Sequence, residues 1–296
     1  MTGQIAVDFR QLLKDKQTVL LDGAMGTQLD KHGLMGRGSC NLDAPDAVLE
    51  IHQAYARCGC DALTTNTLTM NRLYIETHRV GVDVRAVNRA GVELARQAAD
   101  GNRCVLGDMS STGQLMEPYG TFKEPDVRAA LAEQAAILAG AGVDALIIET
   151  MFDLREAVCA VRACKEVSTL PVLVSIAFQT DKNGGRTVMG DTAEQCAKKL
   201  TEAGADAVGA NCGDLDPCQM ANVVAIFASA TDLPIIAQPN AGKPTLVDDR
   251  TVFKMGWTAY AEGMAKCVEG GARIIGGCCG TTPEHIEAVC RQIRQT

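Results

Sequence analysis

Short runs of apolar residues alternate along the chain with longer segments in which apolar residues recur at helical spacing. Several helical segments end in a small residue and a glycine, followed by a polar residue and an apolar run, as at residues 141–148. Glycine supplies the left-handed turn that ends a helix, and continuous apolar runs are typical of buried parallel strands. We predict eight strands, at residues 18–21, 62–65, 104–106, 145–148, 171–177, 207–210, 234–237 and 274–275.

Eight strands that alternate with helices predict an α/β fold, a single-domain (β/α)8 TIM barrel that comprises residues 1–296. The alternative is an open, doubly wound parallel sheet. The Gly-x-Gly-x-x-Gly turn expected after an early strand of many such sheets is missing here. Hydrophobic residues make up 47% of the chain and aromatic residues only 4%, so the core should consist mainly of Ala, Val, Leu and Ile.

Composition and charge exclude several classes of partner. The net charge of -8 and the absence of a basic stripe argue against a nucleic-acid surface. No window reaches the ~18 apolar residues of a membrane helix, and the N-terminus lacks the pattern of a signal peptide. We therefore expect a cytoplasmic protein. Its thirteen cysteines should be mostly reduced thiols, and those within helical patterns should be small buried hydrophobes.

Three cysteines lie where predicted strands give way to loops. Cys212 follows the sixth strand, and Cys278 and Cys279 follow the eighth, in a turn where Gly276, Gly277 and Gly280 supply conformational freedom. In a (β/α)8 barrel the active site is built at the C-terminal ends of the strands. Three thiolates that leave one position open are the ligands of a catalytic zinc site. The helix that follows begins with capping-box spacing, and its N-terminus would favour thiolates. The alternative is a buried cysteine pair or a vicinal disulfide.

Polar residues also end the other strands, and among them are Asp22, Asp108, Glu149 and Gln238. Asp22 and Glu149 could hold the cationic amino group of a substrate. The glycines after Asp22 expose backbone amides that could bind a carboxylate, so together these residues describe an amino-acid pocket. Alternatively, either acid caps a helix or pairs with an arginine. The four histidines show no metal-ligand spacing, and we expect His32, His52 and His78 in loops or on helix surfaces.

These segments together resemble the homocysteine S-methyltransferase family, over nearly the whole chain. The first and last motifs are most similar to the homocysteine-binding module of cobalamin-dependent methionine synthase. The motifs are Asp22-Gly23-Ala24-Met25-Gly26-Thr27, Thr65-Asn66-Thr67, Met116-Glu117-Pro118-Tyr119-Gly120, Ile148-Glu149-Thr150, Asn211-Cys212, Pro239-Asn240-Ala241-Gly242 and Gly276-Gly277-Cys278-Cys279-Gly280-Thr281-Thr282-Pro283.

The resemblance implies an S-methyltransferase that makes methionine from homocysteine. The zinc-bound substrate thiolate would attack the methyl group, without a separate protein base. The implied zinc ligands are Cys212, Cys278 and Cys279, with Asn240 as a fourth ligand before substrate arrives. The implied substrate-binding residues are Asp22 and Glu149 for the amino group, amides near Gly23 and Ala24 for the carboxylate, and Thr67.

The sequence leaves the methyl donor and the acceptor thiol open. No folate-binding or cobalamin domain follows the barrel, so we expect either a small donor or a methyl-corrinoid carried by a separate protein. Leu68 and residues 214–216 depart from the family pattern around the pocket. They motivate a second hypothesis, a different thiol acceptor or a component of a corrinoid-dependent demethylation system. A third hypothesis is a redox or binding barrel with a vicinal Cys278-Cys279 disulfide.

Overall fold

The structure, a computed structural model, describes residues 8–35, 37–247 and 250–294. Within them, eight parallel strands form one sheet in the order β1-β10-β7-β6-β5-β4-β3-β2. A parallel bridge between Leu21 and Ala62 joins the two edges, so the sheet closes on itself. This confirms the predicted (β/α)8 barrel. The strands are β1 (Val19–Leu20), β2 (Ala62–Thr64), β3 (Cys104–Met109), β4 (Ala145–Met151), β5 (Val172–Ile176), β6 (Ala207–Asn211), β7 (Ile235–Gln238) and β10 (Ala272–Ile275).

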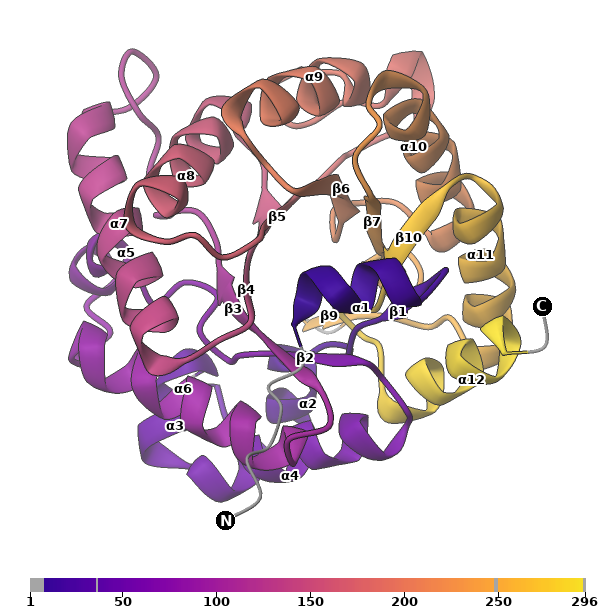
Figure 1. Cartoon of the computed structure of the whole chain (residues 1–296), viewed down its shortest axis with the longest axis horizontal. Helices are drawn as coiled ribbons and strands as arrows, with labels where there is room; N and C mark the ends of the chain where they lie inside the picture. The colour runs from indigo at the N-terminus through magenta and orange to yellow at the C-terminus, as the bar shows by residue number, and fades with distance from the viewer. Residues whose placement is uncertain (1–7, 36, 248–249, 295–296) are drawn as a thin grey trace.

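Helices form an outer ring around the strands, and α1 lies across one end of the barrel (Figure 1). Phe9 of α1 is fully buried and packs with Val19, Leu21 and other inward-facing residues, so this helix closes the N-terminal end. The helices are α1 (Phe9–Asp15), α2 (Gly26–Lys31), α3 (Cys40–Asp43), α4 (Pro45–Arg57), α5 (Arg72–Thr77), α6 (Val84–Ala99), α7 (Glu124–Ala141), α8 (Leu154–Val167), α9 (Ala193–Ala203), α10 (Pro217–Ala230), α11 (Trp257–Glu269) and α12 (Pro283–Ile293).

Alternation along the strands determines which side chains face the barrel axis. Ala145 and Ile147 of β4 pack in the inner cluster, whereas Leu146 and Ile148 pack outward against the helices. Two residues beyond Ile147 the same alternation turns Glu149 inward. The inner positions are apolar near α1 and polar at the opposite end, which we call the mouth. The inward-facing polar residues there are Thr64, Asp108, Glu149, Ser175, Asn211 and Gln238.

The structure adds elements that the apolar pattern did not predict. The connection between β7 and α11 contains an antiparallel hairpin of β8 (Thr245–Val247) and β9 (Arg250–Val252). All three residues of β8 are exposed, so this strand is not one of the buried strands that an apolar run predicts. In the described part of the chain, no helix combines the length and apolar composition needed to cross a bilayer.

His52 is not on a helix surface as expected. It lies on the inner side of α4 and is fully buried, and neither ring nitrogen has a hydrogen-bond partner among the described residues. Burial lowers the pKa of His52 from 6.5 to about 4, because the charged imidazolium is poorly solvated there. The folded protein therefore keeps this side chain neutral.

This burial predicts an acid-dependent loss of stability that His52→Leu should remove. Between pH 6.5 and 4 the unfolded chain binds a proton at His52 that the folded chain does not, so stability falls as pH drops. The variant should gain about 2 kcal/mol on the wild type between pH 7 and pH 5. Urea unfolding of both proteins at the two pH values measures this. A difference in stability that is independent of pH would contradict the assignment.

Candidate metal and amino-acid site

Three cysteine sulfurs meet at the mouth of the barrel. Cys212 follows β6, and Cys278 and Cys279 follow β10, with β7 lying between these strands in the sheet. The three Sγ atoms all lie within 4.8 Å of one another. All three residues are free thiols. The structure thus brings together the three cysteines that the sequence singled out.

The backbone around Cys212 is held in an unusual conformation. Cys212 has a φ of 53°, a left-handed conformation that costs energy for a residue with a side chain. Its N–H donates to the carbonyl of Gln238 at 3.1 Å, which ties the loop to the end of β7. At Gly213 a Cβ atom would lie 2.2 Å from the carbonyl oxygen of Phe178, so only glycine fits there. These constraints fix the direction of the Cys212 side chain.

The glycines near Cys278 serve a different purpose from the one predicted for two of them. Gly280 has a φ of 80°, as expected for a turn that needs left-handed backbone. Gly276 and Gly277 are needed for close packing instead, since a Cβ on Gly277 would lie 2.5 Å from Thr281 Oγ1. The predicted capping box is shifted by one residue: Thr282 is the N-cap of α12, and its N–H donates to His285 Nδ1 at 3.2 Å.

The donor set fits a zinc ion. In a tetrahedral site with Zn–S bonds of about 2.3 Å, two sulfurs lie about 3.8 Å apart, and Sγ of Cys212 and Sγ of Cys279 are separated by 4.0 Å. Asn240, two residues beyond β7, is 1% exposed and donates through Nδ2 to the carbonyl of Gly213. Its Oδ1 is buried and has no hydrogen-bond partner among the described residues. An unpartnered amide oxygen suits the role of an additional ligand.

The cluster also favours a negative charge on sulfur. Hydrogen bonds from the Cys212 and Cys278 thiols lower the pKa of Cys279, and the nearby positive charge of Arg37 acts in the same direction. Hydrogen bonds with Cys212 and Cys279 raise the pKa of Cys278. Asn211 donates an amide N–H to Cys278 Sγ at 3.8 Å. Among the three thiols, the surroundings therefore favour ionisation at Cys279.

Three carboxyl groups lie at the same mouth, and the nearest strand to the sulfurs among theirs is β1, which pairs with β10. Asp22 follows β1, Asp108 lies in β3 and Glu149 in β4. The charges of Asp22 and Glu149 raise the pKa of Asp108, and the charge of Glu149 also raises the pKa of Asp22. We call Asp22, Asp108 and Glu149 the acidic side, and the three cysteines the sulfur side. Gln238 of β7 donates to Glu149 Oε2 at 3.1 Å and so connects the two sides.

Burial shifts the proton equilibria of the acidic side. Desolvation is the largest influence on all three groups. It raises the pKa of Asp22 to about 8 and that of Glu149 to about 7, and it raises the pKa of Asp108 well above its usual range. The described part of the chain forms no salt bridge with any of them. Strongly raised pKa values without an ion-pair partner among the described residues are typical of functional carboxyl groups.

Other predicted substrate-binding groups are partly engaged within the protein. The N–H of Ala24 donates to Thr281 Oγ1 at 2.9 Å. Thr67 is fully buried, and its hydroxyl donates to the carbonyl of Asp108 at 2.7 Å. Gly23 lies against Tyr55 and Thr281, where a Cβ atom would come within 3 Å of both side chains. Contact of Gly23, Ala24 or Thr67 with a substrate stays a prediction.

Tyr260 is a residue of the site region that the sequence did not reveal. It is fully buried in α11, and its hydroxyl lies 3.0 Å from the carbonyl oxygen of Pro239 and 2.9 Å from that of Gly276. These carbonyls precede Asn240 and the Cys278 turn. A single hydroxyl thus links the ends of β7 and β10. The sequence carries no signal for this, because a tyrosine in a helix usually packs by its ring alone.

We expect Tyr260→Phe to lower the free energy of unfolding by about 1–3 kcal/mol, because the carbonyl oxygens of Pro239 and Gly276 would both lose the hydroxyl that donates to them. Denaturant unfolding of the metal-free protein measures this. Tyr74→Phe is a suitable control, because Tyr74 is only half-buried in α5 and stacks on His78. Equal stability of the two variants would show that the Tyr260 hydroxyl contributes nothing.

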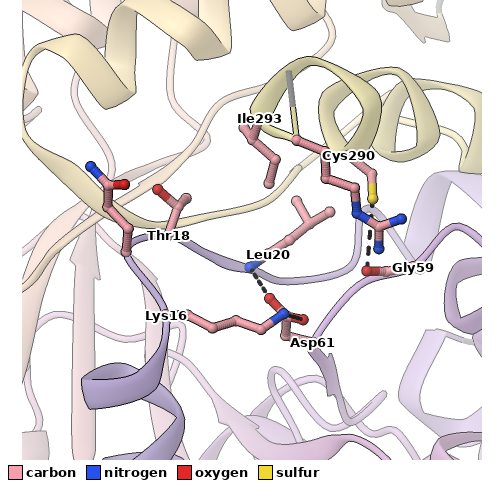
Figure 2. Close-up of a pocket in the computed structure, with 9 residues that line it drawn as sticks. Lys16, Thr18, Leu20, Gly59, Asp61, Cys290 and Ile293 are labelled. Atoms are coloured by element: carbon pink, nitrogen blue, oxygen red, sulfur yellow. Dashed lines mark hydrogen bonds and ion pairs between the residues drawn. The ribbon is translucent and has the colours of Figure 1, made fainter. Parts of the chain in front are cut away.

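A cavity of about 220 Å³ lies at the opposite end of the barrel. In Figure 2, Lys16 points toward Asp61 and Cys290 points toward Gly59, beneath the end of α12. Lys16, Gly59 and Asp61 precede β1 and β2, and that end of a (β/α)8 barrel generally serves stability rather than chemistry. The candidate site is therefore the mouth.

Comparisons with known proteins agree with this location. Residues 19–293 match the family model described as homocysteine S-methyltransferase. The chain is similar to the methionine synthases of Mycobacterium leprae (strain TN) and Mycobacterium tuberculosis (strain ATCC 25618 / H37Rv), with 30% identity in each case. Each match covers 92% of this chain but 24% of the relative, so the chain spans about a quarter of their length.

A solved structure shares the fold. The metallated form of the homocysteine methyltransferase MmuM from Escherichia coli superposes with a TM-score of 0.78 at 22% identity, covering 96% of this chain and 99% of that one. The apo form gives a TM-score of 0.75 at 23% identity, covering 96% and 98%. At this identity the likeness supports the fold alone. The family model covers nearly the whole chain, and the protein therefore belongs to the homocysteine S-methyltransferase family, a family of methyltransferases.

Proposed function

We propose that this protein is a zinc-dependent S-methyltransferase that activates the thiol of homocysteine for methyl transfer, giving methionine. The observation that carries the proposal is the meeting of three cysteine sulfurs within 4.8 Å at the barrel mouth, where Asp22, Asp108 and Glu149 also stand at strand ends. We further propose that residues 1–296 act as one homocysteine-binding domain.

The two sides of the mouth match the two ends of an amino thiol. Cys212, Cys278 and Cys279, with Asn240, would hold the zinc ion. When bound there, zinc would lower the pKa of a substrate thiol and so supply a thiolate near neutral pH. Asp22 and Glu149 would bind the substrate's ammonium group, and Gln238 keeps Glu149 oriented by its hydrogen bond. Burial of these acids strengthens their attraction for a cation.

The surface around the mouth supports a protein partner as methyl donor. Seven of the large hydrophobic residues that are exposed lie on segments that follow barrel strands, and Met35 and Leu246 are each 73% exposed. Exposed large hydrophobic residues on these segments could contact another protein. We propose that a corrinoid protein delivers the methyl group here. The seven residues are Met35, Leu42, Tyr119, Val188, Leu246, Val247 and Trp257.

Product analysis with several donors tests the proposal. Zinc-loaded protein is incubated with homocysteine and, separately, methyl-cobalamin, S-methylmethionine or betaine, and methionine is measured by mass spectrometry. We expect methionine with at least one donor and none after zinc is removed by a chelator. Failure to bind homocysteine while zinc is retained would favour the second hypothesis, a different acceptor thiol. Methionine formation by metal-free protein would refute the role of zinc.

A further inference from the structure

The three carboxyl groups of the acidic side differ in how many hydrogen bonds they already accept. Both oxygens of Asp22 are occupied by Thr64, whose N–H donates to Oδ2 at 3.0 Å and whose hydroxyl donates to Oδ1 at 2.9 Å. Glu149 accepts one hydrogen bond from Gln238. The two acids expected to bind the amino group are therefore partly satisfied before any substrate arrives.

Asp108 has the largest unmet capacity. Its side chain is 6% exposed, and Oδ1 is shielded from solvent without a hydrogen-bond partner among the described residues. A buried carboxylate oxygen without a hydrogen bond destabilises the folded protein, and a ligand that donates a hydrogen bond to it would remove this penalty. Asp108 and Glu149 continue the inward-facing series of the paired strands β3 and β4, and Asp22 is hydrogen-bonded to Thr64 of β2, so the three groups face a common space.

The backbone of Asp108 is held firmly. Its N–H donates to Thr65 Oγ1 at 2.9 Å, and its carbonyl accepts from Thr67 Oγ1 at 2.7 Å. The two hydroxyls also bond to each other at 2.6 Å. Asp108 continues the inward-facing series of Cys104 and Leu106 in β3, so its side chain points to the barrel axis. The orientation of the carboxyl group is thus set before binding.

We propose that Asp108 is the third carboxylate of the amino-group subsite and accepts a hydrogen bond from the substrate's ammonium group. This rests on the proposed function. An ammonium group has three N–H donors. The acids at the ends of β1, β3 and β4 can each accept one of them, because a carboxylate oxygen has two lone pairs. Asp108 thereby helps the site to select an α-amino thiol over a thiol that lacks the amino group.

Calorimetric titration of the zinc-loaded protein with two ligands tests this. The ligands are homocysteine and 4-sulfanylbutanoate, which is homocysteine without its amino group. Asp108→Asn should weaken homocysteine binding about 10- to 100-fold, and 4-sulfanylbutanoate binding by less than about twofold. Glu156→Gln is the matched control, a buried acid of α8 that bonds Thr112 instead. It should change neither affinity.

Selective loss of homocysteine binding supports the role of Asp108. Equal weakening of both ligands, or unchanged homocysteine binding, would overturn it and leave the proposed function standing. Asp108→Ser is measured in parallel, so that poor folding of one variant does not decide the result. If the zinc-loaded wild type bound neither ligand, the proposed function would fail and the role of Asp108 with it.

Discussion

Replacing Cys279 by serine is expected to abolish both zinc retention and thiol methylation. Sγ of Cys279 lies 4.0 Å from Sγ of Cys212, and it carries the lowered pKa of the cluster. A serine hydroxyl stays protonated and is a poor zinc ligand, so two thiolates would have to hold the ion. We expect methyl transfer to fall by more than about 100-fold, beyond the effect of losing an outer-shell contact. Zinc content after dialysis, measured by plasma mass spectrometry, gives the direct readout.

Cys218→Ser provides the control for this experiment. Cys218 is exposed at the start of α10, and its sulfur accepts from Lys266 rather than from any residue of the site. This variant should keep about one zinc ion per chain. Full zinc content together with full activity in Cys279→Ser would show that the metal site lies elsewhere.

Affinity for the product is expected to rise steeply with pH between 6 and 8. The pKa of Asp22 is raised to about 8, so below this pH the free protein carries a protonated carboxyl. An ammonium ligand favours the ionised form, and binding therefore releases a proton. From Asp22 alone the affinity should rise up to about tenfold per pH unit. Methionine is the appropriate ligand, because it has no thiol proton to lose. Calorimetry in buffers with different ionisation enthalpies counts the protons released.

Two variants locate the source of this dependence. Asp22→Asn should make the pH profile less steep, since it removes a carboxyl whose pKa of about 8 keeps it protonated over most of this pH range. Glu156→Gln should leave the profile unchanged, although the pKa of Glu156 is also raised, to about 7, by burial. Binding of methionine that does not vary with pH would contradict the placement of its amino group beside Asp22.

The strands and the sulfur side could be predicted because each depends on local sequence. An apolar run between two turns indicates a buried strand, and cysteines at two strand ends must converge once the barrel closes. His52 and Tyr260 could not be placed in this way. Their environments are set by packing between elements distant in the chain, and a helical pattern does not show which polar residue turns inward.

Asp108 falls between these cases. Its position at the end of a strand was visible in the sequence, and the alternation from Cys104 to Leu106 indicates that it points inward. Its unmet hydrogen-bonding capacity was not visible, because this depends on Thr64 and Gln238 satisfying the other two acids. Sequence patterns reveal which polar groups share a space, whereas the structure reveals which of them still lack a partner.

Helix α1 has a consequence for the order of events in catalysis. Because it closes the N-terminal end of the barrel, we expect substrates to approach the acids and thiols from the mouth. A donor that docks over the mouth blocks the same route. If the proposed donor protein docks there, we expect the thiol to enter first and the methylated product to leave after the spent donor has withdrawn. Steady-state kinetics should accordingly show compulsory order, with the amino acid as the first substrate to bind and the last product to be released.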